Sequence, residues 1–98
     1  MRFRFKSKKL QLLFTEEKGA EKYEAGVLEA FFEVMTLIDA ATDERDLRAF
    51  KSLRLEKLSG KRKHQHSLRL NKQWRLIVQF EEGEEGKQLI IIGIEDYH

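Results

Sequence analysis

Two apolar runs near the end of the sequence constrain the fold most strongly: WRLIVQF at residues 74–80 and QLIIIGI at residues 88–94. The first run alternates, so that one face of a strand carries Trp74, Leu76, Val78 and Phe80. The second run is apolar on both faces, which is typical of a strand inside a sheet. Between them, the charged segment EEGEEGK is expected to form a hairpin loop. Together the runs predict two antiparallel strands.

Two shorter segments upstream show the same period of two. Apolar and polar residues alternate in LRLE at residues 53–56 and in HSLRL at residues 66–70. SGKRKH, residues 59–64, is expected to form the turn between them, and NKQ, residues 71–73, a tight connection to the next strand. From residue 53 onward, the pattern therefore predicts a four-stranded antiparallel meander.

The first half of the sequence has mainly helical periodicity. RFRF, residues 2–5, predicts a short first strand, and apolar residues at helical spacing predict a helix from residue 10 to Gly19. Residues 21–42 are the clearest helix, with one apolar face marked by Leu28, Phe31, Phe32, Met35 and Ile38. Thr42 is expected to cap a short helix at residues 43–50.

This order of elements predicts an α+β fold. It consists of a short N-terminal strand, two helices and then the four-stranded antiparallel meander, with the helices packed on one face of the sheet. The 98 residues contain no internal repeat and no linker-like segment, so we expect a single domain spanning residues 1–98.

The composition limits where the protein works. The sequence has no cysteine, which excludes disulfides and cysteine-based zinc sites and fits a reducing compartment. No segment approaches the roughly 20 apolar residues of a membrane span, and the N-terminus lacks a stretch of signal-peptide length. We therefore expect a cytoplasmic protein.

The net charge of +2 conceals a basic block at residues 51–75, which carries nine Lys and Arg residues and one acid, Glu56. Residues 15–47 instead carry ten acids and three bases. Clustered like charges cost stability unless they are used, so the block indicates a polyanionic partner such as RNA. The alternative is a basic, solvated surface without a partner.

Arg69 and Arg75 are candidate anion-binding residues. The NKQ connection places them on adjacent antiparallel strands, and both point away from the apolar face. Two guanidinium groups on one sheet face form a fork for phosphate or carboxylate. Equally, the two residues can make salt bridges to Glu56 or to the acidic end of the sequence.

The sequence ends in Asp96, Tyr97 and His98, directly after the last apolar run. His98 is a candidate general acid or base, Tyr97 offers a ring for stacking a nucleobase, and Asp96 can orient an imidazole. His64 and His66 form an H-x-H pair, but further ligands of the metal-binding type are too few, so no metal site is expected. Phosphate-binding glycine motifs and nucleophile elbows are not found in the sequence.

The second half of the sequence resembles the HigB-type killer toxins of the RelE/ParE superfamily. The resemblance is close over residues 53–98 and looser in the first half. It is most specific at S-x-R-x-N-x-Q-W-R, residues 67–75, and at the terminal DYH, residues 96–98. The resemblance implies the small RelE-like α+β fold.

The resemblance further implies the toxin of a type II toxin–antitoxin system that cleaves mRNA on the ribosome. In this family the RNA 2′-hydroxyl attacks the neighbouring phosphate without a metal or other cofactor. The implied partners are a HigA-like helix-turn-helix antitoxin and the ribosome, with no membrane; the toxin itself would be monomeric and would form oligomers with the antitoxin. The alternative is a superfamily member that is no nuclease: a ParE-like gyrase poison, or an inactive module that binds antitoxin and RNA.

Individual roles also follow from the resemblance. Arg75 would neutralise the scissile phosphate, Tyr97 would stack on or orient the base, and Asp96 and His98 would position or move protons. Many relatives carry His and Lys where this sequence has Glu56 and Ser59. The alternatives are therefore that Glu56 serves as the general base, that Lys57 replaces it, or that the site is impaired. The expected RNA-binding cations are Arg54, Lys61, Arg62, Lys63, Arg69 and Lys72.

Overall fold

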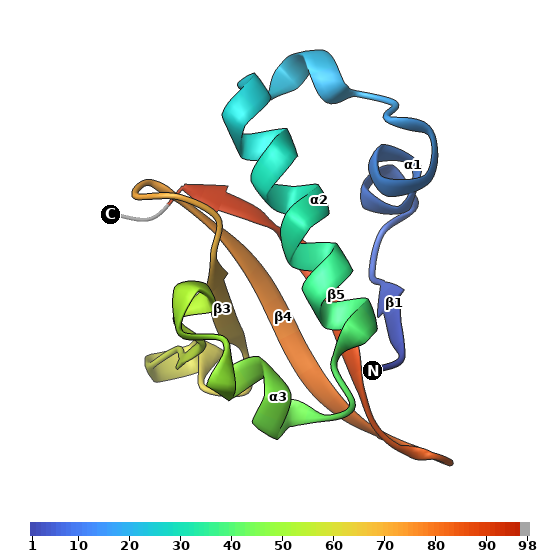
Figure 1. The fold of residues 1–98 in the computed structure, drawn as a ribbon, viewed down its shortest axis with the longest axis vertical. Coiled ribbons are helices and arrows are strands. Elements are labelled where there is room, and N and C mark those ends of the chain that lie inside the picture. Colours follow the sequence, from blue (N-terminus) through green and yellow to red (C-terminus); the bar gives the residue numbers. More distant parts are fainter. Residues whose placement is uncertain (97–98) are drawn as a thin grey trace.

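The computed structural model describes residues 1–96, which form one five-stranded sheet with α-helices packed on one face (Figure 1). The strands are β1 (Phe3–Phe5), β2 (Glu56–Lys57), β3 (His66–Arg69), β4 (Trp74–Gly83) and β5 (Gly86–Asp96). The α-helices are α1 (Lys8–Glu16), α2 (Ala25–Ala40) and α3 (Glu44–Ala49). Three short 3₁₀ turns are η1 (Ala20–Lys22), η2 (Lys51–Leu53) and η3 (Gly60–Arg62). None of the helices described has the length and apolar character needed to cross a membrane.

The strand order is β1-β5-β4-β3-β2, and the predicted antiparallel meander from β2 to β5 is confirmed. The predicted N-terminal strand also forms, and it pairs in parallel with β5, with Phe3 opposite Leu89 and Phe5 opposite Ile91. β5 is therefore an interior strand over this stretch, which explains why its middle is apolar on both faces.

The first strand of the meander is shorter than its sequence pattern predicts. Leu53 belongs to η2, and Arg54 adopts a left-handed conformation with φ of 44°. This geometry interrupts an extended chain, so only Glu56 and Lys57 reach β3. Leu53 is nevertheless buried in the core at 2% exposure, because the turn directs its side chain inward.

Helix α1 ends three residues before Gly19. Ser7 caps its start by accepting the N–H of Leu10 at 3.2 Å, and Glu17 ends it in a left-handed conformation with φ of 55°. Gly19, with φ of 86°, instead precedes η1. Helix α2 consequently begins at Ala25 and not at residue 21.

The short helix predicted at residues 43–50 forms as α3, Glu44–Ala49. Its cap is Asp43 rather than Thr42, because the Asp43 carboxylate accepts the Arg45 N–H at 2.9 Å. The Thr42 N–H in turn donates to the carboxylate of Asp46 at 2.7 Å. These local bonds give a helix of only six residues a defined start.

The core lies between α2 and the sheet (Figure 1). Phe31, Met35 and Ile38 of α2 are buried, as the apolar face predicts, whereas Leu28 and Phe32 are only partly buried. Val27 and Val34 take the remaining buried positions of this helix. Each large apolar side chain contributes about 1.5–3 kcal/mol when it is fully buried.

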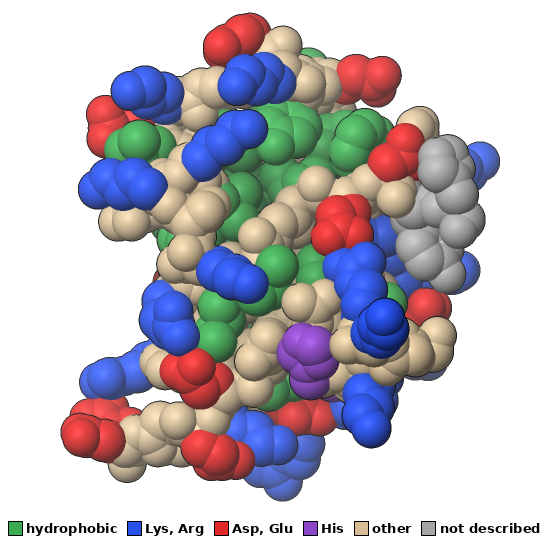
Figure 2. Space-filling model, turned by 180° about the vertical axis from the view of Figure 1, so that it is seen from behind, with side chains coloured by type: hydrophobic (Ala, Val, Ile, Leu, Met, Phe, Trp, Pro, Cys, Tyr) green, Lys and Arg blue, Asp and Glu red, His purple; other side chains and the backbone are tan. Residues whose placement is uncertain are grey.

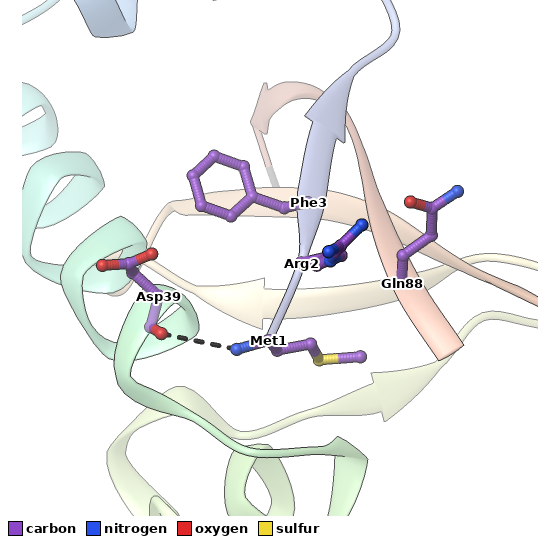
Figure 3. A pocket seen from close by; sticks show the side chains of 5 residues that line it. All are labelled: Met1, Arg2, Phe3, Asp39 and Gln88. Carbon is purple, nitrogen blue, oxygen red and sulfur yellow. Dashed lines mark hydrogen bonds between the residues drawn. The ribbon is translucent and has the colours of Figure 1, made fainter. Parts of the chain in front are cut away.

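The start of the chain is anchored on the end of α2. The Met1 ammonium donates to the carbonyl oxygen of Asp39 at 3.4 Å (Figure 3) and also to that of Ala41. These carbonyls lie at the negative end of the helix dipole, where a cation is favoured. A pocket of about 450 Å³ lies beside this anchor (Figure 3). The Phe3 side chain lies on the side of the pocket toward α2, and Gln88 of β5 lies on the opposite side (Figure 3). The anchor fixes β1 against β5.

A β-bulge interrupts the pairing of β4 with β5. Val78 lies opposite Ile91 and Ile77 lies opposite Gly93, so Ile92 is an extra residue in β5. Side chains alternate between faces, so one extra residue inverts the facing of every residue that follows. As a result, Glu95 lies opposite Arg75 and shares its face of the sheet.

Candidate functional site

A pocket of about 240 Å³ lies on the face of the sheet that the α-helices leave uncovered. Strands β3, β4 and β5 supply its floor, and the segment around η3 supplies one wall. Its lining consists of Leu58, Arg62, Ser67, Arg75, Ile77, Glu95 and Asp96. Seen from behind, Lys and Arg side chains lie on both sides of the view, with acidic side chains among them (Figure 2).

Arg75 is the anchored cation of this pocket. Its side chain is only 6% exposed, and Nε and Nη2 donate to Oγ of Ser67 at 3.2 and 3.0 Å. Nη2 also donates to the carbonyl oxygen of Arg54 at 3.4 Å. Ser67 is fully buried on β3, so it holds the planar guanidinium group in one orientation.

Glu56 lies beside Arg75, on the same face of the sheet as the pocket. Its carboxylate is 3.2 Å from Arg75 Nη2, and its side chain is 51% exposed. Lys57 is the next residue on β2, but it pairs with His66, whereas Glu56 pairs with Ser67. The two candidate bases therefore lie on opposite faces of the sheet, and Glu56 alone shares the face of Arg75.

Arg62 and Glu95 form the second charged pair of the pocket. Nη1 and Nη2 of Arg62 donate to the two carboxylate oxygens of Glu95 at 3.0 and 2.8 Å. The hydrogen bonds that Arg62 donates to this carboxylate raise the pKa of Arg62 above its ordinary value. Both side chains are nearly half exposed, so an anion from solution can compete with Glu95 for Arg62.

The predicted tail residues are only partly described. Asp96 pairs with Trp74, lines the pocket and accepts a hydrogen bond from Nε2 of Gln73 at 3.1 Å. Tyr97 and His98, predicted to stack a base and to move protons, lie outside the described residues. The structure thus places Asp96 at one end of the pocket that contains Arg75.

The remaining predicted RNA-binding residues lie around this pocket or further along the chain. Arg69 is half-buried on β3 directly opposite Arg75, as the sequence predicts. Lys72 is exposed in the β3–β4 turn, at the end of the sheet where Trp74 pairs with Asp96. The other exposed cations of this set are Arg54, Lys61 and Lys63.

The H-x-H pair does not assemble a site. His66 lies edge-on against Phe80, with ring centroids 5.0 Å apart, while His64 is exposed in the preceding turn. Burial, followed by the charge of Arg48, lowers the pKa of His66. Within residues 1–96, no three His, Cys, Asp or Glu side chains come together in a way that can hold a metal ion.

Two pocket residues, Ser67 and Glu95, have no role in the sequence-based prediction. Ser67 stands inside the S-x-R-x-N-x-Q-W-R motif, but nothing in its local pattern shows that it holds Arg75. Glu95 reaches the pocket because of the bulge at Ile92. The available signal for that bulge is Gly93, since a glycine inside a strand often marks one.

The sheet order, the α-helices on one face and the arginine-centred pocket define a RelE-like toxin fold. The structure aligns with a YoeB/ParE toxin from Agrobacterium tumefaciens with a TM-score of 0.61, 13% identity and complete coverage of both chains. In sequence, the chain is 36% identical over 83 residues to Toxin HigB-1 of Vibrio cholerae serotype O1, which covers 85% of this chain and 87% of that protein.

Residues 3–92 match the model of the HigB-like toxin family, described as the RelE-like toxin of the type II toxin–antitoxin system HigB. The chain belongs to this family. Membership implies that it acts as a toxin and that an antitoxin is its partner. The predicted RelE-like α+β fold is likewise confirmed.

Proposed function

We propose that this toxin is an endoribonuclease that cleaves mRNA on the ribosome, in the cytoplasm, without a metal ion in the mechanism. The observation that carries the proposal is the setting of Arg75. Its guanidinium group is buried and held by Ser67, with the half-exposed carboxylate of Glu56 at 3.2 Å. A fixed cation beside an accessible base is the arrangement that phosphodiester cleavage by an internal hydroxyl requires.

In the proposed step, the RNA 2′-oxygen forms a bond to the adjacent phosphorus while the bond from phosphorus to the 5′-oxygen breaks. Glu56 takes the proton of the 2′-hydroxyl, and an acid gives a proton to the leaving 5′-oxygen. The products are a 2′,3′-cyclic phosphate and a free 5′-hydroxyl. Arg75 stabilises the negative charge that builds up on the phosphate oxygens in the transition state.

Glu56 is favoured as the base because it shares the pocket face with Arg75, whereas Lys57 faces the other side of the sheet. The motif resemblance implies that Asp96 and His98 position or move protons and that Tyr97 stacks on or orients the base, and of these we take His98 as the acid. Asp96 positions the reacting groups from the end of the pocket.

Substrate binding is assigned to the exposed cations near the pocket, which neutralise phosphates of mRNA and ribosomal RNA. Binding of this kind weakens with salt. The logarithm of the binding constant falls with the logarithm of the salt concentration, by about 0.7 for each phosphate contact on a single strand. The proposed antitoxin is a HigA-like helix-turn-helix protein that silences the toxin until it is released.

The proposal is tested with purified toxin and ribosomes programmed with a defined mRNA, by measuring single-turnover cleavage. Glu56→Gln is expected to lower the rate about 10²–10⁴-fold, because the base is lost while size and polarity are kept. Lys57→Gln is the matched control on the same strand and is expected to leave the rate nearly unchanged.

Cleavage at the wild-type rate by Glu56→Gln would remove Glu56 from the mechanism. If the wild-type toxin fails to cleave any programmed mRNA but inhibits DNA supercoiling by gyrase, the nuclease proposal is replaced by a gyrase-directed one.

A further inference from the structure

One edge of β5 lies open beside α1. Strand β1 covers β5 only as far as Ile91, where the Lys6 N–H donates to the Ile91 carbonyl at 2.9 Å. The chain then leaves the sheet to enter α1, while β5 continues to Asp96. Within the part of the chain that the structure describes, no strand pairs with this edge of β5 beyond Ile91.

The bulge decides which backbone groups point to the open side. The Trp74 carbonyl accepts the Leu70 N–H at 2.9 Å, so Trp74 and Leu76 face β3 and Ile77 faces β5. Because Ile77 pairs with Gly93, the backbone of Gly93 faces β4, and that of the next residue, Ile94, faces the open edge. Among residues 1–96, no backbone group hydrogen-bonds to the N–H or carbonyl of Ile94 on that side.

An apolar groove runs along this edge. A pocket of about 180 Å³ is lined on one side by Ile92 and Ile94 of β5 and on the other by Leu10 and Leu13 of α1 and by Tyr23. A second hollow, of about 400 Å³, adjoins it over Leu12 and η1. Figure 2 shows hydrophobic side chains at the surface in the upper half of this view, with basic side chains to their left.

The rim of the groove is basic. Lys9 and Lys18 line both hollows, and Lys22 lines the second one together with the acid Glu21. Neither Lys9 nor Lys18 forms an ion pair with any residue in the described range. The groove thus offers apolar walls, two lysines and an unpaired strand edge in one place.

We propose that an extended segment of the antitoxin adds to the sheet along β5 at Ile94, as an extra strand in line with β1. Main-chain hydrogen bonds to an exposed edge supply affinity, and pockets for alternate side chains supply specificity. The segment would alternate apolar residues, which enter the groove, with acidic residues, which meet Lys9 and Lys18. An open strand edge with apolar walls is otherwise an aggregation site, and such a partner protects it.

The test uses the toxin in complex with the protein encoded by the reading frame adjacent to its gene, co-expressed and purified. Amide hydrogen exchange of the Ile94 N–H, followed by NMR, is expected to slow at least about tenfold on complex formation, because a new strand protects it. The Gly93 N–H already faces β4 and is the internal control. Unchanged exchange at Ile94 in a formed complex would overturn the proposal.

Charge variants test the composition of the segment. The double variant Lys9→Glu with Lys18→Glu is expected to weaken antitoxin binding about tenfold in calorimetry, with a reduced salt dependence. The control, Lys51→Glu with Lys63→Glu, changes the net charge equally and lies outside the groove. Equal weakening by both pairs would refute a basic groove rim. Both readouts measure antitoxin binding, so they remain valid whether or not the toxin cleaves RNA.

Discussion

Replacing Arg75 by alanine separates the catalytic from the structural role of the buried guanidinium. In the transition state, Arg75 is expected to supply the stabilisation of one preorganised donor. Such a donor contributes about 2.7–4 kcal/mol, which corresponds to a rate loss of about 10²–10³-fold. Single-turnover cleavage on programmed ribosomes measures this loss directly.

The cost to folding follows from the partners that Arg75 leaves behind. Ser67 is fully buried and loses both of its donors, which is expected to cost about 1–3 kcal/mol. Glu56 is half exposed, so water replaces the lost ion pair. The total is therefore expected to stay below the 3–5 kcal/mol or so that is typical when a fully buried pair is broken.

Arg75→Lys provides the matched comparison. A lysine keeps the charge but cannot bind Ser67 and a phosphate through one planar group, so we expect an activity between those of wild type and alanine. Thermal denaturation of each variant shows whether it is folded at the assay temperature. A folded Arg75→Ala protein that cleaves mRNA at the wild-type rate would refute the assignment of Arg75 to the transition state.

Three further perturbations test other parts of the structure. Deleting Tyr97 and His98 is expected to lower cleavage about 10²–10⁴-fold in the ribosome assay; a truncated toxin that remains fully active would exclude both residues from catalysis. Glu95→Gln releases Arg62 from its carboxylate. The salt dependence of RNA binding is therefore expected to become steeper, by the amount that about one additional phosphate contact contributes. An unchanged salt dependence would mean that Arg62 does not bind phosphate. The pKa of His66 is lowered in the folded protein, so the unfolded chain binds the proton first and stability is lost as the pH falls below about 6.5. Urea denaturation at about pH 7.5 and 5.5 is expected to show this loss in wild type and a smaller loss in His66→Phe, and equal losses would contradict the assignment to His66.

The fold was predictable where side-chain period and burial agree. Alternation in residues 74–80 is confirmed because β4 has one face on the core, and the α2 stripe is confirmed for Phe31, Met35 and Ile38. Parallel pairing of β1 with β5 joins residues 3–5 to residues 89–91, and no local pattern encodes a contact over that separation. Helix ends were displaced by local capping, as at Asp43.

The candidate site was less predictable, because it depends on which face of the sheet each side chain lies on and not on composition. Sequence alternation places Arg69 and Arg75 on one face, and β3 and β4 pair them directly. It leaves Glu56 and Lys57 as equal alternatives, which only their partners on β3 distinguish. Glu95 was missed because a simple alternation through Ile92 sends it to the other face, and a single inserted residue reverses that outcome.

The position of β5 within the sheet has a consequence for the order of folding. β5 is the last strand in the sequence, yet it is the partner of β1 and one of the two partners of β4. Until it has been synthesised, β1 has no partner, and the pocket lacks the strand that brings Glu95 opposite Arg75. Such non-local pairing delays folding, because the loop-closure entropy must be overcome before the contacts form. A nascent chain that has yet to extend through β5 therefore carries the toxin's arginine but not its pocket.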